Sequence, residues 1–304
     1  MTDPKLAHTF DWGRMYSRDR GGTPEVPSIT TVLDVLNQNM EWWEALCATR
    51  LAMEHAEALA SILHMPDGPE RWDRNRAAKD WLQGAAERDR NEASRRGDFV
   101  HDYAETWGLH QLGEATSNDV ARQEALCERA GVSDHLRHFH AFWDHWNPTV
   151  LQPEATVWNK TVGYAGTTDL ICTIEVDGEN VVTVMDWKTK KGLYKRNGAP
   201  KDTDLRDFTG MQLAAAAFAE EIWLPGDSPE ADAWEPFPYE VEVGCAVAIA
   251  PDGYVVRQFA IHNPLMWQTF RALRAAWNFR RDGNQLMSES LSGPDQIRRR
   301  PRAA

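Results

Sequence analysis

Residues 150–189 constrain the fold more than any other part of the chain. Apolar and β-branched residues alternate with polar ones here, and turn signals stand at Gly163 and at Asp177-Gly178. A period of two is the pattern of strands that bury one face, and short turns containing glycine between such runs are typical of hairpins. The sequence therefore predicts three strands of an antiparallel meander over residues 155–189.

Helical patterns surround this meander. We expect helices over residues 30–63, 69–96, 97–113, 117–130, 134–146, 204–223 and 263–283. A Pro-rich acidic loop over residues 224–240 and a hairpin turning at Asp252-Gly253 separate the last two helices. The order helices, strands, helix, strands, helix predicts an α/β (α+β) fold with one central mixed β-sheet flanked by helices and preceded by a helical N-terminal half.

We predict one large domain, for which 304 residues are sufficient. An irregular lead-in rich in glycine and proline covers residues 1–27. The domain covers residues 28–283, with a helical part over 28–148 and a sheet-bearing part over 149–283. A basic flexible tail covers residues 284–304.

The charge of the chain limits how it can engage a polyanion. The net charge is −13, which argues against a general nucleic-acid binder. Seven Lys and Arg residues nevertheless cluster within residues 186–206, and a local basic patch fits a protein that engages a polyanion at one place. No apolar run is long enough to predict a membrane span, and the N-terminus lacks a signal pattern, so we expect a cytoplasmic protein.

The four cysteines, Cys47, Cys127, Cys172 and Cys245, lie far apart in the sequence. None forms a C-x-x-C pair, so a zinc ribbon is not indicated. The spacing leaves a scattered four-cysteine iron–sulfur site open. We favour the simpler interpretation for Cys172 and Cys245, because both lie in apolar strand patterns typical of small core residues.

An Asp-x-Lys sequence, Asp186 to Lys188, ends the apolar run over residues 181–185. Both side chains point to the same face of the predicted strand. Asp169 ends the preceding strand, so a hairpin would bring Asp169 and Asp186 together. Two neighbouring carboxylates repel unless a cation lies between them, and hard oxygen ligands suit Mg²⁺ or Mn²⁺. An ion pair on the sheet surface is the alternative, but the apolar run and Asp169 favour a functional site.

The helix over residues 134–146 contains a second group of potential metal ligands: His135, His138, His140 and His145. A metal site is one interpretation of this cluster. We favour a polar helix face, because the carboxylates and Lys188 offer a better set of groups for chemistry.

The sequence from Gly166 to Asp169, followed by Asp186-x-Lys188, resembles the PD-(D/E)XK nuclease superfamily. The similarity is closer to its RecB-like exonuclease branch, which includes phage-encoded and CRISPR-associated exonucleases and the mitochondrial genome maintenance exonuclease. Helical motifs of this branch are similar, in the same order, to PSITTVLDVLNQNMEWW, RRGDFVHDYAE and MQLAAAAFAE. The resemblance covers residues 28–280 and implies a restriction-endonuclease-like core.

The resemblance also implies roles for individual residues. The catalytic residues would be Asp169, Asp186, Lys188 and Gln212, and the ligands of one or two Mg²⁺ or Mn²⁺ ions would be His101, Asp169 and Asp186. In this scheme a metal-bound water attacks phosphorus, and Lys188 holds that water or stabilises the developing charge. The iron–sulfur members of the branch have a late cluster of cysteines that this chain lacks, so no iron–sulfur centre is expected.

Further residues are candidates for substrate contacts. Glu154 stands where relatives often have a glutamate. Tyr194 is a candidate because Ala216 occupies the position of a tyrosine found in many members. The basic residues that follow the Asp-x-Lys sequence would contact DNA phosphates; these are Lys190, Lys191, Lys195 and Arg196.

The function implied by the resemblance is a metal-dependent DNA exonuclease acting in phage or bacterial recombination, repair or replication. Its partners would be single-stranded DNA or duplex ends, together with a recombination or replication protein. It would act in the cytoplasm, or in the host cytoplasm if it is phage-encoded. Two alternatives stay open: a catalytically silent nuclease-fold protein that binds nucleic acid or serves as a scaffold, and an RNA-directed nuclease.

Overall fold

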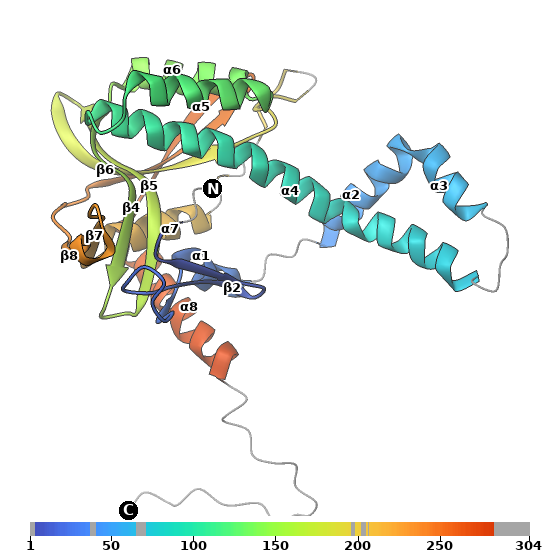
Figure 1. The fold of residues 1–304 in the computed structure, drawn as a ribbon, viewed down its shortest axis with the longest axis horizontal. Coiled ribbons are helices and arrows are strands. Elements are labelled where there is room, and N and C mark those ends of the chain that lie inside the picture. The colour runs from blue at the N-terminus through green and yellow to red at the C-terminus, as the bar shows by residue number, and fades with distance from the viewer. Residues whose placement is uncertain are drawn as a thin grey trace, which may run out of the picture.

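A mixed β-sheet lies at the centre of the molecule (Figure 1). The computed structural model describes residues 4–36, 41–64, 71–195, 198–201, 205 and 207–282. Within them the sheet has seven strands in the spatial order β10-β9-β6-β5-β4-β7-β8. The strands are β4 Thr149–Asn159, β5 Tyr164–Val176, β6 Glu179–Thr189, β7 Glu221–Leu224, β8 Ala233–Pro236, β9 Val243–Ala250 and β10 Gly253–Phe259.

The pairing of the strands confirms the predicted fold class. β4, β5 and β6 form the expected antiparallel meander, and β9 and β10 form the expected hairpin. β6 pairs with β9 in parallel, which makes the sheet mixed. The fold is therefore α/β (α+β), with a central mixed sheet flanked by helices.

Helices cover both faces of the sheet (Figure 1). One face packs against α4 Arg71–Gln111, α5 Ser117–Arg129 and α6 Ser133–Trp146. The other face packs against α7 Asp207–Ala217, which in turn contacts α1 Ile29–Leu33 and α8 Pro264–Asp282.

Strand β6 shows how the alternation of side chains divides core from site. Met185 and Trp187 point into the core beneath α4–α6, and Trp187 is only 2% exposed. Val184 faces α7, and Asp186 bonds to a side chain of that helix. Trp187 is therefore a core residue. The prediction that Cys172 and Cys245 are core residues is confirmed, because both are buried in the same core.

Three predicted helices differ from the structure in the N-terminal half. Residues 30–63 do not form one helix: α1 is followed by the 3₁₀ turn η1 Asp34–Leu36, and then by α2 Glu41–Glu54 and α3 Ala56–Leu63. The break at His55, whose backbone is not helical, lets α2 and α3 both pack against α4. These helices and the N-terminal half of α4 extend away from the sheet as a helical arm (Figure 1).

The predicted boundary at Gly97 is also wrong, because residues 69–96 and 97–113 contribute to the single helix α4. A glycine costs a helix interior only about 1 kcal/mol, which tertiary packing readily offsets. The position has a packing role, since a Cβ at Gly97 would lie 3.4 Å from Oγ1 of Thr189 on β6.

Two further expectations fail because short segments bury aromatic residues against the sheet. The helix predicted over 204–223 ends at Ala217, and Ile222 then pairs with Val157 as part of β7. The acidic loop contains β8 and the 3₁₀ turn η2 Pro229–Ala231.

The lead-in is not irregular. It forms a three-stranded sheet of β1 Ala7–Phe10, β2 Gly13–Tyr16 and β3 Val26–Pro27. Leu6 and Tyr16 are buried against Trp158 and Trp223 of the central sheet, and this burial gives the segment its order.

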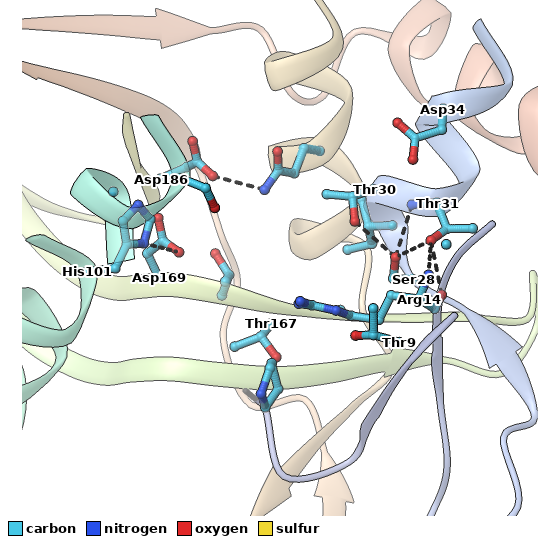
Figure 2. A pocket seen from close by; sticks show the side chains of 18 of the residues that line it. Thr9, Arg14, Ser28, Thr30, Thr31, Asp34, His101, Thr167, Asp169 and Asp186 are labelled. Atoms are coloured by element: carbon cyan, nitrogen blue, oxygen red, sulfur yellow. Dashed lines mark hydrogen bonds and ion pairs between the residues drawn. The ribbon is translucent and has the colours of Figure 1, made fainter. Parts of the chain in front are cut away.

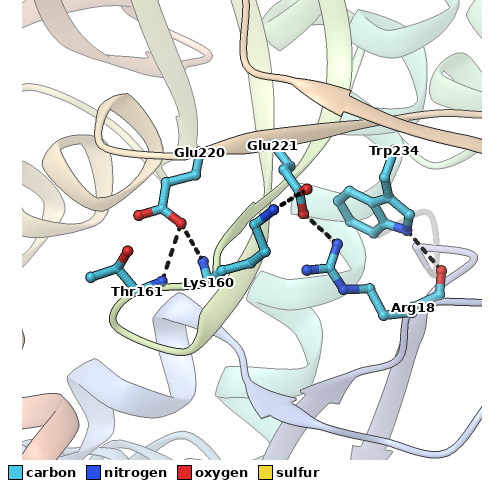
Figure 3. A network of polar contacts seen from close by, with 6 residues as sticks. All are labelled: Arg18, Lys160, Thr161, Glu220, Glu221 and Trp234. Carbon is cyan, nitrogen blue, oxygen red and sulfur yellow. Dashed lines mark hydrogen bonds and ion pairs between the residues drawn. The ribbon is translucent and has the colours of Figure 1, made fainter.

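Charged side chains fasten this N-terminal sheet to β7 (Figure 3). Glu221 accepts from Arg18 Nη1 and from Lys160 Nζ, each at 2.5 Å. The Arg18 guanidinium lies 4.1 Å from the ring centre of Trp158 and 4.8 Å from that of Trp234. The indole N–H of Trp234 donates to the Arg18 carbonyl at 2.9 Å. The segment before α1 is thus held at one edge of the sheet.

The described helices include none that is both long and apolar enough to cross a membrane. The predicted tail over residues 284–304 lies outside the described residues. The division into domains stays a prediction.

Candidate metal centre

A pocket of about 900 Å³ opens beside the end of the meander. Its lining comes from the N-terminal sheet, α1, α4, α7, α8 and the strands β4, β5 and β6. Figure 2 shows His101, Asp169 and Asp186 at one end of the pocket, and Arg14, Ser28, Thr30 and Thr31 at the other. The predicted catalytic residues therefore line the same cavity as residues of the lead-in.

The pairing of β4 with β5 brings two carboxylates face to face. Pro153 pairs with Leu170 and Ala155 pairs with Thr168, so Glu154 lies opposite Asp169. Glu154 has a φ of 43°, an unusual value inside a strand. His101 approaches from α4, and one ligand atom from each of His101, Glu154 and Asp169 lies within 4.8 Å of the other two.

Asp169 is held by two neighbours. Its Oδ1 lies 3.4 Å from Nδ1 of His101, and its Oδ2 accepts the backbone N–H of Trp187 at 2.6 Å. The second contact links the Asp169 carboxylate on β5 to the backbone of β6, the strand that carries Asp186. The position of this carboxylate therefore depends on the register of the β5–β6 hairpin.

Asp186, Lys188 and Gln212 form a second group next to the first. Asp186 is 3% exposed, and its Oδ2 lies 2.6 Å from Nζ of Lys188. Its Oδ1 accepts from Nε2 of Gln212 on α7 at 2.9 Å. The structure thus places the aspartate, lysine and glutamine of the predicted site in direct contact. Glu154 rather than Asp186 completes the group of ligand atoms around His101 and Asp169.

The pKa values reflect this crowding of charge. Burial, with the nearby charge of Asp169, raises the pKa of Glu154 to about 9. Burial also raises the pKa of Asp186, although Lys188 opposes the change. For Asp169 the cost of burial is outweighed by His101 and Lys188, and its pKa lies below the usual value. The pKa values of His101 and Lys188 are both raised, because attraction to the aspartates exceeds the effect of burial.

These donors fit a divalent cation. Two ionised carboxylates that face each other in a buried place repel, and burial first and the charge of Asp169 second raise the pKa of Glu154. A cation would remove the repulsion. Oxygen ligands suit Mg²⁺ and Mn²⁺, and an imidazole ligand favours Mn²⁺ of the two. His101, Glu154 and Asp169 would hold the ion, and Asp186 adds a further carboxylate in the same pocket.

Other predicted contacts lie outside the lining of this pocket. Tyr194 is half exposed and forms a backbone bridge with Pro200. Lys191 pairs with Asp89 of α4 at 2.6 Å. Lys190 and Lys195 are likewise absent from the pocket lining, and Arg196 lies outside the described residues.

The histidines of α6 do not converge. His135, His138, His140 and His145 each contact a different group: the Lys190 carbonyl, the Pro251 carbonyl, the Tyr103 hydroxyl and the Tyr254 hydroxyl. Within the described part of the chain they form no group that could hold a metal. The expected polar helix face is not formed as such, because His135 is buried and His145 is exposed.

Sequence reasoning missed the contribution of residues 9–34 to the pocket. Phe10, Trp12, Arg14, Ser28 and Thr31 all line it. The signal available was the alternation in AHTFDWGRMY, with Asp11 and Trp12 as a turn between two short strands.

Comparisons with known proteins add little to this picture. No family model and no curated protein matches the sequence. Among solved structures, one described as "Crystal structure of SSO0001" is similar at a TM-score of 0.29 and 18% identity, over 60% of this chain and 75% of that chain. Because the TM-score is so low, we base no argument on this similarity.

Proposed function

We propose that this protein is a metal-dependent deoxyribonuclease, an exonuclease of the PD-(D/E)XK superfamily. The observation that carries the proposal is the convergence of His101, Glu154, Asp169, Asp186 and Lys188 in one pocket. The resemblance of the sequence motifs to the RecB-like branch supports it. The mixed central sheet is compatible with the restriction-endonuclease-like core that the resemblance implies.

The burial of the site argues against a simple ion pair on the sheet surface. An exposed pair contributes little, whereas Asp186 is almost fully buried and shares its carboxylate between Lys188 and Gln212. Keeping such charged groups together in a buried place is costly for stability. A functional role explains why the chain retains them.

Each side chain has a role in hydrolysis. A bound Mg²⁺ or Mn²⁺ would lower the pKa of an attacking water and neutralise charge on the scissile phosphate. His101, Glu154 and Asp169 would hold the ion. Lys188 donates hydrogen bonds to the phosphate oxygen on which charge develops. Gln212 orients Asp186, which in turn fixes the position of Lys188.

A timed digest tests the proposal. DNA oligonucleotides labelled at the 5′ or 3′ end, single- or double-stranded, are incubated with purified protein in Mg²⁺, Mn²⁺ or EDTA. We expect stepwise shortening in the presence of metal and none in EDTA. Asp169→Asn should lower the rate of cleavage by more than about 10³-fold, because it removes the negative charge of the carboxylate that contacts His101 and would bind the metal. Circular dichroism checks that the variant is folded.

The outcome also separates the alternatives. Binding of DNA without hydrolysis in any metal would favour a silent binding or scaffold protein. Cleavage restricted to RNA would favour the RNA-directed nuclease. Location in the cytoplasm and a partner protein of recombination or replication stay predictions.

A further inference from the structure

An exposed aromatic pair lies in the lining of the metal pocket. The rings of Phe10 and Trp12 stack with centroids 5.1 Å apart and an angle of 8° between their planes. Phe10 is 42% exposed and Trp12 is 55% exposed, and both belong to the pocket lining. We call these two residues the aromatic platform.

The fold holds the platform firmly in place. It sits on the turn between β1 and β2, where Gly13 has a φ of +142° and a Cβ would lie 2.6 Å from Cγ2 of Thr31. Thr31 Oγ1 accepts the backbone N–H of Arg14 at 2.7 Å and donates to the Arg14 carbonyl at 3.0 Å. The hairpin is therefore fastened to α1, and Trp12 also approaches Trp277 of α8 at 6.3 Å.

Polar groups connect the platform with the metal end of the pocket. Arg14 and Thr167 both belong to the lining, and Figure 2 shows them in the same pocket as Asp169. Ser28 and Thr30 add hydroxyl groups, and Arg280 adds a second guanidinium to the lining. A strand of phosphates can follow such groups from the platform to Asp169.

Charge alone does not select the occupant, because Asp11 and Asp34 belong to the same lining as the two arginines. The exposed flat rings are the selective feature. Continuity with the metal pocket argues for a polymer whose backbone reaches the metal centre and whose side groups are flat. Unpaired nucleobases have this chemistry, whereas the bases of a duplex are already stacked inside it.

We propose that the aromatic platform stacks unpaired bases of single-stranded DNA whose phosphate backbone runs through the same pocket to the metal centre. The proposal rests on the proposed function and names the strand that the site accepts. Trp12 is the stacking residue, and Phe10 supports its ring from behind.

Binding in EDTA tests the platform without hydrolysis. The probes are a fluorescein-labelled 20-nucleotide single strand, the same strand with an abasic tract, and the corresponding duplex, each followed by anisotropy. Trp12→Ala should weaken binding of the normal strand about tenfold and leave the abasic strand and the duplex unchanged. Trp12→Phe, which keeps a ring, should restore most of the affinity.

The control is Phe279→Ala, which removes an aromatic residue that is 67% exposed on α8 but outside the pocket lining. It should bind all three probes as the wild type does. Equal affinity of Trp12→Ala and wild type for the normal strand would overturn the platform, and so would an equal loss on the abasic strand. Tighter binding of the same sequence as RNA would overturn the choice of DNA.

The two proposals fail in different ways. If the wild type cleaves DNA in Mn²⁺ and Trp12→Ala binds and cleaves equally well, only the platform is wrong. If the wild type neither binds nor cleaves any of the probes in any metal, the proposed function is wrong, and the platform is wrong with it.

Discussion

The two ends of the pocket are built by different means. At the metal end, adjacent strands β4, β5 and β6 position Glu154, Asp169 and Asp186 through their backbone pairing. At the other end, the hairpin of β1 and β2 carries Trp12 and is fastened to the core by side-chain contacts. The pocket therefore combines a part fixed by the register of the central sheet with a part held against that sheet mainly by tertiary contacts and by one backbone bridge, Ser28 to Ala165.

The two ends of the pocket also differ in how deeply their charged groups are buried. At the metal end, charged groups are buried and depend on each other, so a change at one should disturb the rest. At the aromatic end the two rings are exposed, and charges of both signs, Asp11, Asp34, Arg14 and Arg280, belong to the lining. Substitutions should therefore have large effects on catalysis at the metal end, and smaller effects on binding or stability at the other.

The largest effect in this comparison is expected for Lys188→Met, which keeps the length of the side chain and removes its charge. Lys188 is the cation that contacts Asp186, and no hydrogen bonds would then reach the phosphate from this position. We expect kcat to fall by about 10²- to 10³-fold. Initial rates on labelled single-stranded DNA in saturating Mn²⁺ measure this fall.

Lys160→Met is the matched control, because Lys160 pairs with Glu221 outside the pocket lining. It should retain the wild-type rate. A Lys188→Met enzyme that cleaves at the wild-type rate would show that the lysine is only a structural partner of Asp186.

An intermediate effect is expected for Glu154→Gln. The substitution removes a carboxylate from the group formed with His101 and Asp169, so affinity for Mn²⁺ should fall about tenfold or more. Titration calorimetry with Mn²⁺ measures the affinity, and the rise of the melting temperature with added Mn²⁺ gives a second measurement. In EDTA the variant should be about as stable as the wild type, because Glu154 with a pKa of about 9 is already protonated at neutral pH and glutamine keeps a neutral side chain there.

Glu128→Gln provides the comparison for this experiment, since Glu128 is exposed on α5 and belongs neither to the ligand group nor to the pocket lining. Its Mn²⁺ affinity should match that of the wild type. An unchanged Mn²⁺ affinity of Glu154→Gln would show that Glu154 is not a ligand of the metal. Its raised pKa would then have no connection with metal binding.

The metal end could be predicted from the sequence because its geometry follows from local patterns. The apolar run before Asp186 and the turn at Asp177-Gly178 define two paired strands, and the period of two places Asp186 and Lys188 on one face. The resemblance implies a role for Gln212, and in the structure its side chain donates a hydrogen bond to Asp186. The position of Glu154 opposite Asp169 does not follow from a local pattern, because it depends on the β4–β5 register, which shifts between Val150 and Gln152.

The aromatic end could not be predicted in the same way. The strands β1 and β2 have four residues each, too few for a periodic pattern to stand out. Their order comes from burial of Leu6 and Tyr16 against tryptophans more than 140 positions later in the chain, a contact that no local pattern contains. The break at His55 was missed for a similar reason, since packing of α2 and α3 on α4 decides it.

The smallest effect is expected for Glu221→Gln, which weakens the fastening of the N-terminal sheet (Figure 3). Burial alone would raise the pKa of Glu221, but the contacts with Lys160 and Arg18 outweigh it and hold the pKa below the usual value. The folded protein therefore favours the ionised form. The stabilisation is complete above the unfolded pKa and is lost as the pH falls through the lower folded pKa.

At pH 7 we expect Glu221→Gln to lower the free energy of unfolding by about 1 kcal/mol, as measured in urea. The difference from wild type should persist at pH 6 and shrink toward zero near pH 3. Glu235→Gln, an exposed change on the neighbouring strand β8, should show no comparable difference at either pH. If Glu221→Gln also reduces single-strand affinity while leaving Mn²⁺ affinity intact, the two ends of the pocket are held independently. An equal loss of both would mean that the N-terminal sheet also supports the metal end.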